Sequence, residues 1–114
     1  MANMQAVVFD AVRPSEHRNP ADRSIARERL RTAYDWLETN LDRSPWAIGE
    51  QFTLADCAAA PSLFYADWVE EIDRSHPQLK AYRARLLAQP VVARAVDEAR
   101  SYRPLFPLGA PDRD

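Results

Sequence analysis

A few side chains in this sequence are of types that act in catalysis or metal binding, but their spacing favours a structural role for each of them. Cys57 is the single cysteine, so no intrachain disulfide can form. Its place near the start of a predicted helix could lower the pKa of the thiol, but its apolar neighbours favour a buried, unreactive group. His17 and His76 stand far apart without metal-ligand spacing, so we expect no metal site. Phosphate-loop, GxSxG and CxxC motifs are absent from the sequence, which leaves no recognisable catalytic signature.

Thr53 and Asp56 stand three residues apart just before an apolar run, which is the spacing of a helix capping box. In that motif the Thr53 hydroxyl accepts from the backbone N–H of Asp56, and the Asp56 carboxylate accepts from the N–H of Thr53. Phe52 and Cys57 occupy the two positions of a hydrophobic staple around this helix start. We therefore expect a structural role, with Asp56→Ala lowering stability by about 1–2 kcal/mol.

The capping box opens an apolar segment from Leu54 to Val69 that is interrupted mainly by Asp56, Ser62 and Asp67. A helix that is apolar nearly all round is usually buried among other helices. We expect this helix to run to about residue 72 and to form the centre of an all-α bundle.

Helix-start signals and apolar periodicity predict four more helices. A short one covers residues 4–12 and is ended by Pro14. A second, of about 20 residues, starts with Asn19 as N-cap and Pro20 at the first position, and ends near residue 41; its acidic residues Asp35 and Glu38 fall on a solvated face. The last two open at residues 76–77 and at Pro90. The fold class is thus all-α, a bundle of about five helices around a buried central helix.

The segments between these helices carry apolar residues that we expect to pack on the bundle. Trp46 and Ile48 should tuck into the core from the loop over residues 42–51. The Pro-rich tail over residues 102–114 completes a single domain spanning residues 1–114; Leu105 and Phe106 should lie against the bundle, whereas residues 112–114 should be frayed.

Composition excludes several classes of function. With only two glycines and no alternating β-branched runs, strands are not expected. A formal net charge of −2 gives no basic field for nucleic acid, and the apolar segment after Thr53, although it begins like a helix-turn-helix motif, is too apolar and acidic to face phosphate. No apolar run approaches the roughly 20 residues of a membrane span, and no signal peptide is recognisable, so a cytoplasmic protein is expected.

The segment Trp46–Asp56, WAIGEQFTLAD, resembles the loop and N-capping box of the C-terminal domain of glutathione transferases. In that family a Gly-containing loop leads through an aromatic or aliphatic residue to Ser or Thr, two further residues and Asp. The order of the predicted helices is similar over nearly the whole chain. The resemblance implies a domain that supplies the hydrophobic co-substrate pocket and part of a dimer interface, with glutathione as the family's co-substrate.

The resemblance also implies a set of pocket residues. Tyr65 stands nine residues after Asp56, where some bacterial members place an aromatic residue that borders the substrate pocket. Met4, Val7 and Val8 would line the same pocket from the first helix. Packing in the core is the alternative reading for all four residues.

Family members carry the glutathione site and the catalytic residue in an N-terminal thioredoxin-like domain, for which no strand is predicted here. We therefore expect no catalytic or cofactor-binding residue in this chain, and no activation of glutathione by the chain alone. The expected partners are a second copy of the chain, a thioredoxin-like domain and a hydrophobic small molecule. The alternative is a non-enzymatic helical module that dimerises or docks a partner.

Overall fold

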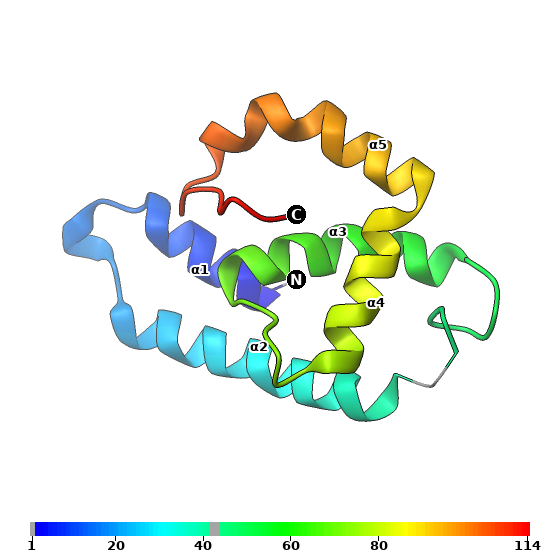
Figure 1. Cartoon of the computed structure of the whole chain (residues 1–114). Helices are drawn as coiled ribbons and strands as arrows, with labels where there is room; N and C mark the ends of the chain where they lie inside the picture. The colour runs from blue at the N-terminus through cyan, green and yellow to red at the C-terminus, as the bar shows by residue number, and fades with distance from the viewer. Residues whose placement is uncertain (1, 42–43) are drawn as a thin grey trace.

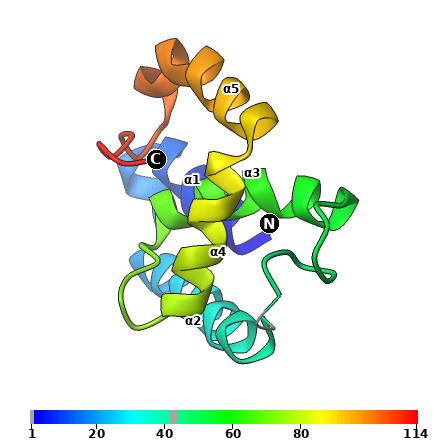
Figure 2. The same ribbon diagram turned by 45° about the vertical axis from the view of Figure 1, so that its right-hand side comes forward.

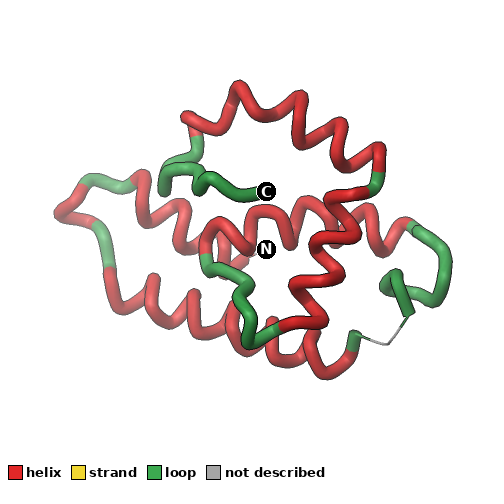
Figure 3. The backbone as a smooth tube through the Cα atoms, viewed as in Figure 1, coloured by secondary structure: helices red, strands yellow, loops and turns green. Residues whose placement is uncertain are grey.

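The computed structural model describes residues 2–41 and 44–114, and in this part of the chain five α-helices follow one another without a strand (Figures 1 and 3). The predicted all-α fold is therefore confirmed. The helices are α1 (Ala2–Val12), α2 (Pro20–Asn40), α3 (Leu54–Val69), α4 (Pro77–Ala88) and α5 (Pro90–Ala99). Two 3-10 turns, η1 (Ser15–His17) and η2 (Arg100–Leu105), follow α1 and α5. None of the described helices combines the length and apolarity required to cross a lipid bilayer.

The core lies where α1, α2 and α4 pack around α3, which runs through the middle of the molecule (Figure 1). Each of these four helices contributes residues to one apolar cluster, for example Val7, Leu30, Leu63 and Leu79. The last helix, α5, buries none of its residues. In two views 45° apart it stays at the outer edge of the molecule, on the side away from α2 (Figures 1 and 2).

The start of α2 is the one predicted from its sequence. The Asn19 side-chain oxygen accepts from the backbone N–H groups of Ala21 and Asp22 at 3.1 and 3.4 Å, and Pro20 is the first helical residue. Asp10, buried in α1, fixes the same corner because its carboxylate accepts from the N–H of Asn19 at 2.8 Å and pairs with Arg23 at 2.9 Å.

The prediction that α3 reaches residue 72 is wrong, because α3 ends at Val69. The backbone turns extended at Glu70, and the carboxylate of Asp67 accepts from the N–H of Ile72 at 2.9 Å. A side-chain acceptor thus takes the place of the next helical carbonyl and ends the helix.

Two acidic residues expected on a solvated face of α2 also connect α2 to the start of α4; Asp35 is exposed, as expected, whereas Glu38 is half-buried. The two carboxylate oxygens of Glu38 accept from the N–H groups of Gln78 and Leu79, each at 2.8 Å. Asp35 contacts the ring of His76 at 2.7 Å. Glu38 therefore caps the first turn of a helix that lies about 40 residues away in the chain, where a negative charge is favoured.

Three expectations about the connecting segments are wrong. Ile48 and Leu105 are 67% and 75% exposed rather than packed on the bundle. The last residues are not frayed, because the indole N–H of Trp68 donates to the carbonyl of Arg113 at 3.2 Å. Trp46 and Phe106 do pack against the core, as expected, although both are only half-buried.

Candidate functional site: an apolar groove along the third helix

One side of α3 faces away from the core although its residues are apolar. The exposed residues repeat at helical spacing and form what we call the α3 stripe: Leu54, Cys57, Ala58, Pro61 and Tyr65. Leu54 is 86% exposed and Tyr65 44%. One side of α3 is therefore left uncovered by other helices, and the expectation of a helix buried all round is wrong for the α3 stripe. The expectation of a buried Cys57 thiol is wrong for the same reason, because position 57 belongs to the stripe.

The start of α3 is held by the predicted capping box. The Thr53 N–H donates to Oδ2 of Asp56 at 2.9 Å, and the Thr53 hydroxyl lies 3.4 Å from the same oxygen. Two partners from outside the motif add to it at Oδ1: the N–H of Ala47 at 2.9 Å and the hydroxyl of Tyr82 at 2.6 Å. Asp56 is fully buried, so these donors replace the water that its carboxylate loses.

The electrostatics of Asp56 follow from these contacts. Burial by itself raises the pKa of this carboxyl, but the hydrogen bonds from Tyr82, Ala47 and Thr53 favour the charged form and together hold its pKa below the usual value. In the hydrogen bond between Tyr82 and Asp56, burial and the charge of Asp56 raise the pKa of the Tyr82 hydroxyl. An ionised carboxylate with both oxygens occupied positions the helix and has no free lone pair for proton transfer.

The two residues of the predicted staple stand in different surroundings. Phe52 is half-buried and packs edge-to-face on Trp46, with ring centroids 5.1 Å apart. Cys57 is exposed. Both line the groove beside α3, and a direct contact between them stays a prediction.

Three of the four predicted pocket residues lie around one hollow. Met4 and Val8 from α1 and Tyr65 from α3 line an apolar space of about 270 Å³, which we call the α1–α3 hollow. Its walls are completed by Gln5 and Phe9 of α1, by Pro61 and Val69 of α3 and by Phe106 of the tail. Val7 does not line it, because its side chain points into the core and is fully buried.

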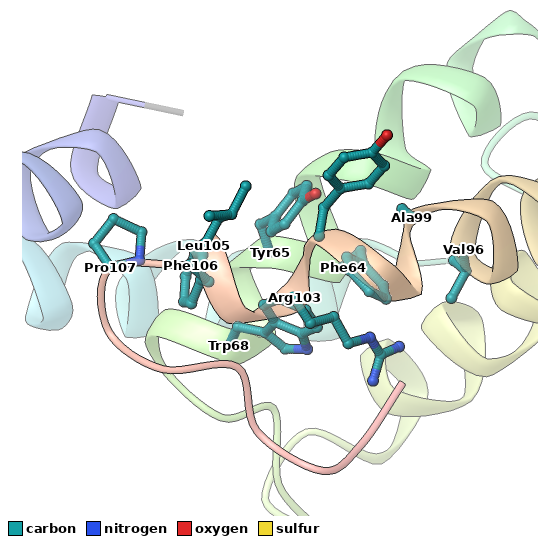
Figure 4. Close-up of a pocket in the computed structure, with 10 residues that line it drawn as sticks. Phe64, Tyr65, Trp68, Val96, Ala99, Arg103, Leu105, Phe106 and Pro107 are labelled. Carbon is teal, nitrogen blue, oxygen red and sulfur yellow. The ribbon is translucent and has the colours of Figure 1, made fainter.

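Two further hollows adjoin this one, and Tyr65 lines all three. A groove of about 560 Å³ separates α3 from α5, with Cys57, Pro61 and Tyr65 on one wall and Val92 and Ala95 on the other. A space of about 240 Å³, which we call the tail hollow, lies between α3, the end of α5, η2 and the tail (Figure 4). Tyr65 therefore stands at the junction of a continuous apolar surface.

Aromatic rings make up much of that surface. Tyr65 meets Trp68 edge-to-face at 5.5 Å and lies roughly parallel to Phe106 at 6.2 Å between centroids. Phe64 and Trp68 are 4.8 Å apart. Phe64, Trp68 and Phe106 line the tail hollow together with Tyr65, so its walls are largely aromatic.

Sequence reasoning missed a buried charge cluster behind these rings. Asp67 is 4% exposed, and its Oδ2 accepts from Nε of Arg113 at 2.7 Å. Arg83, also buried, lies 3.7 Å from the same oxygen and donates to the carbonyl of Leu63 at 3.2 Å. An aspartate inside an otherwise apolar helix was the available signal, because a buried carboxylate requires a cationic partner.

Metal-binding geometry is not found among the described residues, in which no three His, Cys, Asp or Glu side chains gather to hold an ion. Cys57 lies in an apolar groove, and the residues that line the groove with it include no histidine or carboxylate that could act as a base. The arrangement can bind and orient an apolar molecule.

Comparisons with known proteins show to which family this fold belongs. The family model described as "Glutathione S-transferase, C-terminal domain" matches residues 8–85. Two proteins named 2,5-dichlorohydroquinone reductive dechlorinase, from two strains of Sphingobium indicum, are each 35% identical to this chain over 86 residues. The match covers 63% of this chain and 25% of each relative, so the chain corresponds to about a quarter of the length of the curated relatives it matches. No solved structure gave a significant match. Because the family model covers more than half of the chain and the fold is all-α, the chain belongs to the glutathione S-transferase C-terminal domain family.

Proposed function

We propose that this chain acts as the co-substrate-binding domain of a glutathione transferase-like protein. In this proposal the α1–α3 hollow binds the hydrophobic electrophile, and glutathione is bound and activated by a thioredoxin-like domain. The observation that carries the proposal is that Met4, Val8 and Tyr65, from two different helices, line one apolar space of about 270 Å³.

The size and walls of the hollow favour a single-ring aromatic ligand. An engineered apolar cavity of about 150 Å³ accommodates benzene, so about 270 Å³ leaves room for ring substituents. The ring of Tyr65 offers a stacking surface. The curated relatives are named for a dichlorinated hydroquinone, and we propose a chlorinated aromatic compound as the co-substrate class here as well.

The walls of the hollow support a binding role rather than a catalytic one. The side chains around it are apolar apart from the Gln5 amide and the Tyr65 hydroxyl, and none carries a charge. Attack of a glutathione thiolate on an electrophile requires a group that stabilises the thiolate. We therefore propose that glutathione enters as a co-substrate held outside this chain, and that the chain alone does not catalyse conjugation.

Amide chemical-shift mapping with 2,5-dichlorohydroquinone tests the binding role. We expect shifts centred on Met4, Val8 and Tyr65, and at least a fivefold weaker affinity for Tyr65→Ala. Leu54→Ala is the matched control, because Leu54 belongs to the same helix but lines none of the three hollows. Shifts confined to other surfaces, or equal weakening by both variants, would contradict the proposal.

A dimerisation module is the second candidate, and the exposed residues of α1 favour it. Phe9 and Val12 are 58% and 61% exposed, and Ile25 of α2 is 47% exposed. Phe9 and Ile25 line a common hollow between α1 and α2. Large exposed apolar side chains that cluster are typical of protein contacts. Sedimentation equilibrium separates the candidates, with Ile25→Ser as the variant because Ile25 does not line the α1–α3 hollow. A dimer that Ile25→Ser dissociates, together with no ligand-induced shifts in the unmodified chain, would favour the dimerisation module.

A further inference from the structure

We propose that Ser75, His76 and Asp35 form a hydrolytic site for neutral esters of small carboxylic acids. In this site the Ser75 hydroxyl is the nucleophile, His76 is its base, and Asp35 positions the imidazole. The site goes beyond the proposed function, because it uses neither glutathione nor the apolar hollows beside α3. A nucleophile, base and acid of this kind are recognised by their geometry rather than by their order in the sequence.

The contacts join the nucleophile to the acid through the imidazole. Oγ of Ser75 lies 3.1 Å from Nδ1 of His76, and Nε2 of His76 lies 2.7 Å from Oδ1 of Asp35. Because an ionised aspartate only accepts hydrogen bonds, Nε2 carries a proton, and in the neutral ring Nδ1 keeps its lone pair toward Oγ. Nδ1 is therefore placed to take the proton of Ser75 when its oxygen attacks a carbonyl carbon.

Two helices hold these groups in place. Asp35 belongs to α2, and His76 is the N-cap residue of α4, just before Pro77. The start of α4 lies beside α2 in two views of the molecule (Figures 1 and 2), and there the ring of Tyr34 packs edge-to-face on His76 with centroids 5.8 Å apart. The His76 side chain is only 12% exposed, so packing fixes the base, whereas Ser75 is exposed and open to a substrate.

Asp73 orients the hydroxyl of Ser75. Its Oδ1 accepts from the backbone N–H of Ser75 at 2.8 Å and from Oγ at 2.6 Å. The hydrogen bonds from Ser75 hold the pKa of Asp73 below its ordinary value, so this carboxyl group stays charged and acts as an acceptor. The single hydroxyl proton is thus shared between Asp73 and Nδ1 of His76, and it passes to His76 during the attack.

A small polar hollow beside the hydroxyl limits the ester that can react. Its volume of about 130 Å³ is below the roughly 150 Å³ that holds benzene, so it suits an acetyl group rather than a benzoyl group. Glu70 and Glu71 line it, which favours a neutral substrate. Arg31 lines it as well and binds Glu70 through Nε and Nη2; its third nitrogen, Nη1, can donate to the carbonyl oxygen as that oxygen becomes negative.

The reaction takes two balanced steps. Oγ of Ser75 bonds to the acyl carbon while its proton passes to Nδ1 of His76, and the bond from the acyl carbon to the leaving alcohol breaks as His76 protonates that alcohol. Water then attacks the ester formed on Ser75, His76 takes a proton from the water, and the bond to Oγ breaks as the proton returns to it. The products are the alcohol, the small acid and the unmodified side chain.

Hydrolysis of p-nitrophenyl acetate by the full chain, without glutathione, tests the site through the absorbance of released nitrophenolate. Ser75→Ala and His76→Gln should each lower the rate above that of buffer by about tenfold or more. Ser24→Ala and His17→Gln are the matched controls, because both residues are exposed and lie outside the polar hollow; they should leave the rate unchanged. The chain should not accelerate cleavage of p-nitrophenyl benzoate.

Asp35→Asn should lower kcat by about threefold or more and leave KM unchanged, because Asp35 contacts the imidazole and not the ester. Asp35→Glu should recover part of kcat, since it returns a carboxylate to Nε2 of His76. Mass spectrometry of an acid-quenched reaction should find the acetyl group on Ser75.

Three results would each overturn the proposal: no acetyl group on Ser75, a rate that Ser75→Ala leaves unchanged, or equal losses of rate in His17→Gln and His76→Gln. The first two decide the matter even if His76→Gln fails to fold, because they require only the natural chain and a substitution at an exposed residue. None of these results bears on dichlorohydroquinone binding near Met4 and Val8, so the two proposals can fail separately.

Discussion

Asp56 and Tyr82 share a buried hydrogen bond of 2.6 Å that joins the first turn of α3 to the middle of α4. The same carboxylate caps its own helix through Thr53 and holds the preceding loop through Ala47. One side chain therefore sets where α3 begins and how it lies against α4. Since a helix is stiff, it also sets where Tyr65 stands in the apolar groove.

The first prediction is that Asp56→Ala costs about 2–4 kcal/mol of unfolding free energy, more than the 1–2 expected for a helix cap alone. The reason is that the hydroxyl of Tyr82 and the N–H of Ala47 would lose their partner inside the protein. Urea denaturation followed by circular dichroism measures the loss. Tyr82→Phe should cost about 1–2 kcal/mol, and the two changes should not be additive.

Asp97→Asn serves as the control for that series, because Asp97 is exposed and pairs with Arg100 on the surface. It should change stability by less than about 0.5 kcal/mol. Additive effects of Asp56→Ala and Tyr82→Phe would show that the hydrogen bond between them contributes little.

Acid should destabilise the chain through Asp56. Its pKa is lowered in the folded chain, so the unfolded chain binds the proton first as the pH falls. The stability contributed by Asp56 is complete above its unfolded pKa of about 4 and is lost progressively below that pH. Urea midpoints measured from pH 6 to pH 2.5 should fall more steeply for the natural chain than for Asp56→Asn. Urea midpoints that fall equally steeply in both proteins would mean that other carboxyl groups cause the loss of stability in acid.

Local chemistry made much of the fold predictable from the sequence. The N-cap of α2 at Asn19 and the capping box at Thr53 and Asp56 depend on residues at most three positions apart, and both form. Leu30 and Tyr34, four residues apart and therefore on one side of α2, are likewise both buried. Such signals act within one turn, so they need no knowledge of the tertiary structure.

Long-range partners could not be predicted in the same way. Glu38 looks solvated on its own helix and becomes a cap only when α4 is brought beside it. Cys57 looks buried in an apolar run, but α5 lies too far from α3 to cover it, and a groove remains between them. Of the predicted pocket residues, Met4 and Val8 face the α1–α3 hollow, whereas Val7 faces the core. The rotation of α1 about its own axis decides which residues face which side.

The exposure of Cys57 gives a third prediction. The native chain should react with an aromatic disulfide reagent at a rate within about threefold of the denatured chain, because the thiol lies on the exposed side of α3. Absorbance of the released thiolate measures the rate, and Cys57→Ser provides the blank. Protection of more than a hundredfold in the native state would mean that α5 closes over the groove in solution.

Glu38→Ala should destabilise the chain by about 1 kcal/mol, the usual value of a helix N-cap. The substitution removes the acceptor for the N–H groups of Gln78 and Leu79 at the start of α4. Thermal denaturation gives the effect, and faster amide hydrogen exchange at Leu79 should accompany it. Glu28→Ala is the matched control, because Glu28 is an exposed glutamate on the same helix. Equal losses of stability in the two variants would mean that Glu38 acts only through its helix propensity in α2.

The last prediction concerns the tail, which Asp67 holds to α3. Asp67→Asn keeps the size of the side chain but removes the charge that pairs with Arg113 and Arg83. Leaving these guanidiniums without their counter-charge should lower the free energy of unfolding by about 2 kcal/mol. It should also release the tail, because Arg113 loses its ion pair and its carbonyl is then no longer held in place as the acceptor for Trp68. Heteronuclear NOE values of Ala110 and Arg113 should therefore fall in Asp67→Asn and stay unchanged in Glu98→Gln, whose partner Arg94 lies on the surface of α5. A tail that stays rigid in Asp67→Asn would mean that Arg100 and Arg103, through Asp114, are enough to hold it.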